Sequence, residues 1–202
     1  MAGRVVKQAR AERTRAAVLL GAAEVFAEHG FSGASVMKIA DRAGVTLGGV
    51  YFHFRSKEEL ARAIVTGQPD FVVPPDSSKG LQRAIDVTRT WARQLVESPM
   101  LRAGARLVWE QDRFMEAGEN SHQQWTGLVI ADLQAAQDAG ELAPGVDIKA
   151  MARLVVNACT GAQMHSYVET GHLDLPERVE EIWRCLLPAL GASGEIEMRD
   201  GR

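Results

Sequence analysis

Apolar residues recur at three- and four-residue spacing along most of this 202-residue chain. That spacing places them on one face of an α-helix, whereas no segment shows convincingly the strict alternation that predicts a half-buried strand. The first stripe includes Val18, Ala22 and Phe26 and stops at His29-Gly30, where glycine can adopt the left-handed C-cap conformation. We therefore expect an all-α protein with about nine helices.

The residues that begin the other expected helices are polar side chains suited to N-caps. Ser35, Thr46 and Ser56 each precede a helical stretch, and Glu59 completes a capping box with Ser56. Two long helices near the C-terminus are expected to begin in the same way, after Asp147 and Asp174. The helices expected after the first cover residues 36–42, 46–52, 57–67, 81–95, 101–115, 121–139, 148–170 and 175–190.

Composition limits the compartment and the kind of chemistry. No apolar run approaches the ~20 residues that span a bilayer, and the N-terminus lacks the apolar stretch of a signal peptide. We therefore expect a cytoplasmic protein with no membrane partner. The two cysteines, Cys159 and Cys185, are too few and too isolated for a disulfide framework or a zinc site, so both are expected to be buried.

Positive charge is concentrated at one end of the chain. Up to Arg62 there are ten lysines and arginines against six aspartates and glutamates, whereas the remaining 140 residues carry thirteen against twenty. A basic N-terminal arm that includes Arg4, Lys7 and Arg10 suits the phosphate backbone of DNA, which the acidic remainder would repel. A run of charge is also typical of a solvated tail, so a second feature has to support DNA binding.

That second feature is a short helix, a glycine turn and another short helix within residues 36–52. The pattern is typical of a helix-turn-helix, whose second helix enters the major groove of DNA. In this second helix Thr46 and Tyr51 offer hydroxyl groups to phosphates or base edges, and Gly48 lets the backbone approach closely. An ordinary helical corner is the alternative on spacing alone.

Four motifs decide between these alternatives: residues 31–40 (FSGASVMKIA), 43–46 (AGVT), 49–54 (GVYFHF) and 56–60 (SKEEL). Together they closely resemble the signature of the TetR family, from about Arg13 to Ile64. The resemblance implies a transcriptional repressor that binds operator DNA and is released by a small molecule. It places operator contacts at Ser35, Lys38, Thr46, Gly48, Tyr51, His53 and Lys57.

One position departs from the family pattern. Leu47 stands where the family very often has lysine, so one contact to a phosphate or guanine is missing. Leu47 can instead meet a thymine methyl group and change the preferred operator. The other interpretation is weaker binding that depends more on the basic arm.

Further motifs resemble one subgroup of that family, the γ-butyrolactone receptors, which sense lactone, butenolide or furan signals and control antibiotic production. The motifs stand at residues 10–15, 51–54, 99–107 and 181–183, together with Trp125. In this subgroup the tryptophan that matches Trp125 lines the ligand pocket. A repressor for another apolar molecule, such as an antibiotic, and a receptor without a physiological ligand are the alternatives.

The residue types in the larger domain suit a small amphiphilic ligand. Apolar side chains provide a lining and a few uncharged polar groups provide fixed hydrogen bonds, so a phosphorylated or strongly cationic ligand is disfavoured. Ordinary core packing or hydrogen bonding to the backbone is the structural alternative for each of them. The candidates are Gln68, Trp109, Trp125, Val129, Val155, Thr160 and Gln163, with Trp109 expected to face inward.

An enzyme is not expected. The sequence has no glycine-rich phosphate loop, no zinc-binding histidine pair and no nucleophile elbow, and its five histidines are scattered. A lactonase needs a serine, histidine and acid set that no spacing here suggests. We therefore expect no catalytic residue, no metal and no cofactor.

The last two expected helices carry more apolar surface than one monomer covers, including Leu154, Ala162, Ile182 and Leu186. Two copies of this pair would form a four-helix bundle, so a homodimer through the last two helices is expected. We accordingly expect a DNA-binding domain with its basic arm at residues 1–55 and a ligand-binding and dimerisation domain at residues 56–202.

Overall fold

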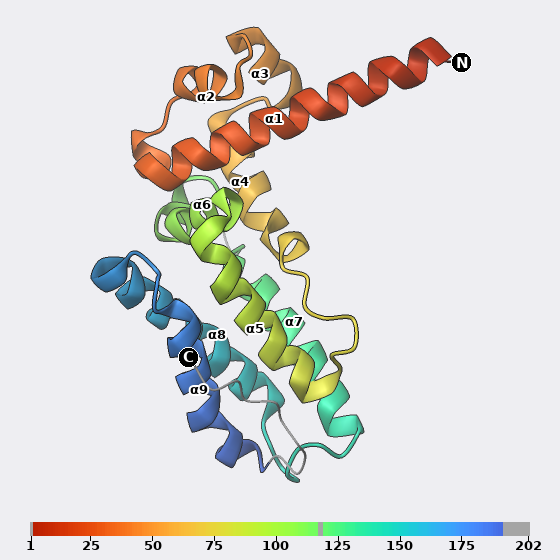
Figure 1. Ribbon diagram of the computed structural model, residues 1–202, viewed down its shortest axis with the longest axis vertical. Coiled ribbons are helices and arrows are strands. Elements are labelled where there is room, and N and C mark those ends of the chain that lie inside the picture. Colours follow the sequence, from red (N-terminus) through yellow and green to blue (C-terminus); the bar gives the residue numbers. More distant parts are fainter. Residues whose placement is uncertain (1, 117–118, 192–202) are drawn as a thin grey trace. The chain divides into compact units, whose positions relative to one another are not determined.

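The structure is a computed structural model. It describes residues 2–116 and 119–191, with side chains described from Val6 onward (Figure 1). The described residues form nine α-helices and two 3₁₀ helices without any strand, which confirms the all-α prediction. In chain order the elements are α1 (Ala2–Gly33), α2 (Val36–Ala43), α3 (Leu47–His53), α4 (Lys57–Gly67), η1 (Gln68–Phe71), α5 (Gly80–Glu97), α6 (Pro99–Leu107), η2 (Val108–Arg113), α7 (Ser121–Asp138), α8 (Ile148–Thr170) and α9 (Leu175–Leu190).

The chain forms two compact units, each built from two segments. Unit 1 contains Met1–Phe71 and Ser98–Asn120, and unit 2 contains Val72–Glu97 and Ser121–Arg202. Unit 1 therefore joins the expected helix-turn-helix to α4, α6 and the two 3₁₀ helices. The expected functional boundary after residue 55 divides the chain in another way and stays a prediction. No helix of the described part is long and apolar enough to cross a membrane.

Unit 1 is organised around α1, which packs against α6, α2 and α4. The stripe that includes Val18, Ala22 and Phe26 is fully or almost fully buried, together with Ile39 of α2 and Val50 of α3. Burial of each large apolar side chain stabilises the unit by about 2 kcal/mol. These contacts fix the position of the short α2 and α3 helices on the longer α1.

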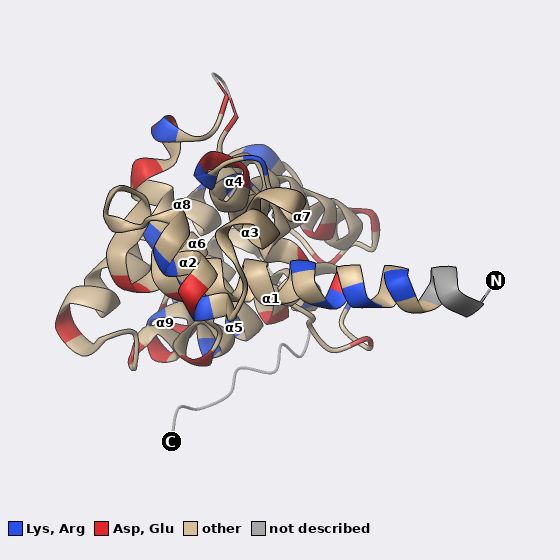
Figure 2. Cartoon of the chain, turned by 90° about the horizontal axis from the view of Figure 1, so that it is seen from above, with Lys and Arg blue, Asp and Glu red and all other residues tan. Residues whose placement is uncertain are grey.

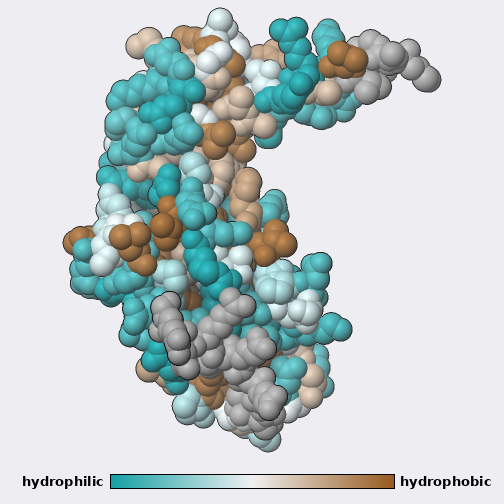
Figure 3. Space-filling view, in the orientation of Figure 1, coloured by the Kyte–Doolittle hydropathy of each residue, from teal (hydrophilic) through white to brown (hydrophobic). Residues whose placement is uncertain are grey.

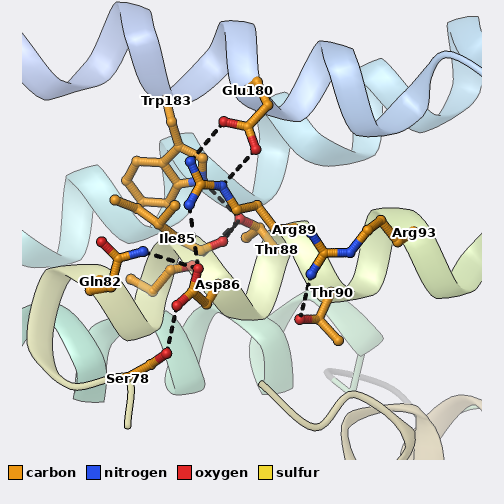
Figure 4. Close-up of polar contacts among 11 residues, drawn as sticks. Ser78, Gln82, Ile85, Asp86, Thr88, Arg89, Thr90, Arg93, Glu180 and Trp183 are labelled. Carbon is orange, nitrogen blue, oxygen red and sulfur yellow. Dashed lines mark hydrogen bonds and ion pairs between the residues drawn. The ribbon is translucent and has the colours of Figure 1, made fainter. Parts of the chain in front are cut away.

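Unit 2 places α5 against α7 and α9, while α8 packs against α7 and α9. A buried polar network joins α5 to α9 (Figure 4). The Nε of Arg89 lies 2.6 Å from an Oε of Glu180, and the indole N–H of Trp183 donates to the Thr88 hydroxyl at 2.8 Å. Arg89 is buried and also contacts Asp86 of its own helix at 3.4 Å, so its ion pair with Glu180 is the charged contact that links α5 to α9.

The helix expected at 101–115 is wrong in both its start and its end. Helix α6 begins at Pro99, with the Ser98 hydroxyl as its N-cap, and after Leu107 the chain tightens into η2. Inside η2 the backbone of Glu110 leaves the helical region (φ −120°, ψ 15°). As a result Trp109 is 55 % exposed, and the expectation that it faces inward is also wrong.

Two further expectations fail for local reasons. Asp174 does not cap α9, because its carboxylate accepts hydrogen bonds from Ser166, Thr170 and Arg178 instead. These bonds hold the pKa of Asp174 well below its ordinary value, the Arg178 guanidinium having the largest effect. Cys159 is buried as expected, and burial raises the pKa of its thiol to about 12, whereas Cys185 is exposed on α9.

Candidate DNA-binding surface and ligand-binding residues

The turn between α2 and α3 is fixed by local hydrogen bonds. The Ser35 hydroxyl accepts from the Lys38 amide at 3.2 Å, and the Thr46 hydroxyl accepts from the Gly49 amide at 3.1 Å. Between the two helices Gly44 takes the left-handed conformation (φ 65°) that a side chain would disfavour. The helix-turn-helix geometry expected from these residues is therefore present.

The exposed side of α3 is composed of residues suited to a DNA groove. Val50 is fully buried and anchors the helix, while Leu47 is 46 % exposed and Tyr51, one turn later, is 49 % exposed. Gly48 lies beside Leu47 and presents no side chain. This surface can offer an apolar contact, a hydroxyl group and close backbone approach to one partner.

The basic residues proposed to contact DNA differ in whether their side chains are exposed or already bind other groups of unit 1. Lys7 and Arg10 are exposed on α1, where Figure 2 shows lysines and arginines following one another along the helix. The side chain of Arg4 lies outside the described residues. Lys57 is engaged within unit 1, because its Nζ donates to the carbonyl groups of Phe31 at 2.8 Å and Ala34 at 3.1 Å.

Two other predicted DNA contacts lie on α2 and at the end of α3. Lys38 is exposed and its Nζ reaches the Gly33 carbonyl at 3.3 Å, a bond at the surface that water or a phosphate can replace. His53 is half-buried in the last turn of α3, with its ring 5.0 Å from the ring of Phe52, which is 80 % exposed. Phe52 is thus a large exposed apolar group on α3 that the sequence analysis did not select.

Gln68 follows α4 directly and is only 4 % exposed. Among the described residues its Nε2 has no hydrogen-bond partner, which is costly for a buried polar atom. The amide lies over Gly104 of α6, where a Cβ atom would come within 1.0 Å of that Nε2. Glycine at this position therefore makes the space that Gln68 occupies, a relationship that no sequence pattern indicated.

The other ligand candidates have different surroundings. Trp125 is half-buried on α7, and Val129 and Val155 are buried within unit 2. The Thr160 hydroxyl donates to the carbonyl group of Val156 at 2.8 Å, and Gln163 bonds to the His172 ring at 3.0 Å. Of the polar candidates, Gln68 is therefore the one whose amide nitrogen has no partner among the described residues.

Helices α8 and α9 leave a shallow groove of about 370 Å³ between them. Its lining is largely apolar, with one arginine and one glutamate, and includes Leu154, Ala158, Ala162, Arg178, Glu181, Ile182, Cys185 and Leu186. Further exposed apolar side chains, Val168 and Leu173, surround the connection between the two helices, where Figure 3 shows hydrophobic groups at the surface. The described residues leave this apolar surface uncovered.

Comparison with known proteins agrees with this geometry. Residues 18–64 match the model of bacterial regulatory proteins of the tetR family, and residues 78–191 match a tetracyclin repressor-like C-terminal domain. The chain is 35 % identical to the A-factor receptor protein of Streptomyces griseus over 192 residues, 95 % of this chain and 69 % of that relative.

Two solved structures extend the likeness to the whole fold. TylP, a tetR regulator from Streptomyces fradiae, is 38 % identical, with a TM-score of 0.82 over 91 % of this chain and 89 % of that one. A γ-butyrolactone receptor described as ArpA-like is 28 % identical, with a TM-score of 0.69 over 90 % and 89 %. Since this family consists of transcription regulators, the expectation that the chain is not an enzyme is confirmed. The chain belongs to the TetR family of DNA-binding transcription regulators and is related to the A-factor and γ-butyrolactone receptors.

Proposed function

We propose that this TetR-family regulator is a homodimeric repressor that leaves its operator when a small amphiphilic signal of the γ-butyrolactone, butenolide or furan type binds. The observation that carries the proposal is the buried Nε2 of Gln68, which has no hydrogen-bond partner among the described residues and so calls for an additional acceptor. The likeness to a γ-butyrolactone receptor supports a lactone as the source of that acceptor.

The operator side of the proposal rests on α3 and the basic residues near it. We propose base or phosphate contacts by Ser35, Lys38, Thr46, Leu47, Gly48, Tyr51 and His53, with phosphate contacts by Arg4, Lys7 and Arg10. For Lys57 we now favour a positioning role, since two carbonyl groups already accept hydrogen bonds from its ammonium group. The two helix-turn-helix heads of a symmetric dimer, one from each protomer, require a partly palindromic site with half-sites about 34 Å apart or somewhat more.

Each unit by itself carries proposed ligand contacts. In unit 1 Gln68 donates a hydrogen bond and Trp109 supplies an exposed aromatic surface. In unit 2 the proposed contacts are Trp125, Val129, Val155, Thr160 and Gln163. Thr160 and Gln163 already bond within unit 2, so their ligand contacts would have to replace or share those bonds.

The connection between ligand and operator is proposed to run through α4. Its first turn is capped by Ser56, three residues after the end of α3, and Gln68 follows its last turn. A ligand that accepts a hydrogen bond from Gln68 would therefore act on α4, the helix that follows the proposed DNA-reading helix α3. By linkage, the small molecule and the operator lower each other's binding affinity by the same factor. Full release needs the small molecule to bind the released state more tightly than the operator-bound state by about 5 kcal/mol.

Footprinting followed by gel shifts tests the proposal. The footprint should show a dyad, and lactones, butenolides or furans should release the protein from that site. Protection without a dyad would contradict the dimeric repressor. A dyad with no release by any of these compounds would leave a TetR-type repressor for another ligand, or a receptor without one.

A further inference from the structure

Within unit 1, the carboxylate of Glu110 in η2 binds the backbone where α1 leads into α2. One oxygen accepts from the Phe31 amide at 2.8 Å, and the other accepts from the Ser32 amide at 3.1 Å and from the Ser32 hydroxyl. These residues are 78 and 79 positions apart in sequence. Three donors converging on one carboxylate form a strong and directional attachment.

The backbone at this corner is shaped for such a carboxylate. Gly30 has a left-handed φ of 67° that breaks the regular hydrogen bonding of α1, so the amides after it need another acceptor. A Cβ atom at Gly30 would also come within 2.6 Å of the Glu110 carboxylate. Glycine at position 30 therefore serves both the turn and the approach of Glu110.

The same peptide is held from α4 as well. Lys57 donates to the carbonyl group of Phe31, and its Nζ lies 4.1 Å from the centre of the Phe31 ring. The ring of Phe114, just after η2, is 5.2 Å from the Phe31 ring, and its carbonyl group accepts from Arg62 at 2.7 Å. Phe31 is thus the residue at which α4 and η2 both hold the helix-turn-helix.

The element that carries Glu110 is built to move at low cost. Six residues of 3₁₀ helix exceed the usual length of three or four, and Glu110 itself has a non-helical backbone. No residue of η2 is buried, so displacement of η2 would sacrifice little apolar packing. The Glu110 bonds join η2 to the end of α1, and Phe114, just after η2, packs on the Phe31 ring.

We propose that Glu110 is a positioning residue for operator binding: its carboxylate sets the orientation of α2 and α3 and passes any displacement of η2 to them. The inference rests on the proposed operator binding and adds a second route beside α4. Burial tends to raise the pKa of Glu110, but the bonds from Ser32 and Phe31 outweigh it and lower the pKa, so the carboxylate is ionised at neutral pH.

Glu110→Gln in the full-length protein tests the inference, with Asp112→Asn as the matched control. Asp112 lies in the same 3₁₀ helix and is exposed, so its replacement makes the same change in charge without touching the corner. Affinity is measured for the footprinted operator, for the same operator with one base pair inserted between its half-sites, and for a scrambled duplex. Thermal unfolding is followed for each variant.

Glu110→Gln should weaken operator binding about tenfold, because one charged set of hydrogen bonds is lost. It should also reduce the preference for the natural spacing, while binding to the scrambled duplex stays close to that of the parent and the unfolding temperature falls only slightly. Asp112→Asn should change none of these. Ser32→Ala, which leaves the two amide bonds, should shift the spacing preference in the same direction by a smaller factor.

The contrary outcomes can be told apart. If Glu110→Gln matches Asp112→Asn, or lowers affinity for every duplex and the unfolding temperature together, the inference is overturned. Tyr51→Ala serves as the reference for operator reading. If Tyr51→Ala also leaves operator affinity unchanged, the proposed operator surface fails and the inference falls with it.

Discussion

Two regions of the molecule leave apolar side chains uncovered, and they differ in what surrounds those side chains. On α3 the exposed Leu47 and Phe52 stand beside the hydroxyl of Tyr51, and the adjoining helix α2 carries the exposed Lys38. In the α8–α9 groove, Leu154, Ala162, Ile182 and Leu186 are accompanied by one arginine and one glutamate that balance in charge.

The difference indicates two kinds of partner. An apolar surface with hydroxyl groups and exposed basic side chains on the adjoining helices suits DNA, where thymine methyl groups lie close to phosphates. An apolar groove without excess charge suits a second copy of the same helices. The accompanying charges, rather than the apolar area, therefore distinguish the proposed operator surface from the proposed dimer surface.

The largest expected effect comes from placing a charge in the groove. Ala162→Arg should give a monomer, because an unpaired guanidinium would be buried between the two α8–α9 pairs. Operator affinity should fall by a factor of about 100 or more, since the second head no longer binds intramolecularly. Sedimentation and gel shift measure both changes, and Leu186→Arg should repeat them.

Ala131→Arg is the matched control for the groove. It makes the same substitution at an exposed position of α7 in unit 2, so the dimer and its operator affinity should persist. An Ala162→Arg protein that sediments as a dimer would show that the groove has another occupant.

On the operator surface, Tyr51→Ala should lower affinity about 10- to 100-fold, the range of a lost base-edge or phosphate contact. Leu20→Ala, at an exposed apolar position of α1, should have little effect. Fluorescence anisotropy with labelled operator measures both. Equal affinities for the two variants would mean that α3 does not read the operator.

Gly104→Ala should destabilise the protein by about 1–3 kcal/mol, because the new methyl group displaces the buried Gln68 side chain. Gln68→Ala combined with Gly104→Ala should recover most of the loss, since the smaller side chain leaves room for the methyl group. Denaturant unfolding of the two single variants and the double variant gives the coupling energy. A coupling energy of zero would contradict the packing of Gln68 on Gly104.

The smallest effect is expected from Leu47→Lys. This change restores the lysine of the family pattern and adds a positive charge to α3, which makes its surface differ further from the charge-balanced α8–α9 groove. Binding to all duplexes should strengthen a few-fold at low salt, and the salt dependence should steepen by about one unit for each head. Gel shifts at several salt concentrations measure this. An unchanged salt dependence would place position 47 away from the phosphates.

The parts of the fold that depend on neighbouring residues were predictable from the sequence. Ser35, Thr46 and Ser56 each cap the helix that directly follows, because the hydroxyl and the amide it accepts are only three residues apart. Glu59 reaches back as a capping box requires, although it accepts from the Arg55 amide, one residue before the cap. Such contacts form wherever the local backbone turns.

The contacts that the sequence did not indicate join distant segments. Glu110 finds its donors at Phe31 and Ser32, and Gln68 fits only because Gly104 on another helix has no side chain. Asp174 shows the converse case, because three nearby donors take the carboxylate that a capping rule assigns to α9. Local patterns therefore identified the helices and the proposed reading surface but not the long-range contacts around them.

The most direct test of a ligand-released repressor is reciprocal titration. Operator affinity is measured with and without a lactone, butenolide or furan that releases the protein, and the affinity for that compound is measured with and without operator. The two affinities should fall by the same large factor, and Trp125→Ala should keep operator binding but lose the release. Operator binding that no such compound alters, or release that persists in Trp125→Ala, would contradict the proposed γ-butyrolactone-type response.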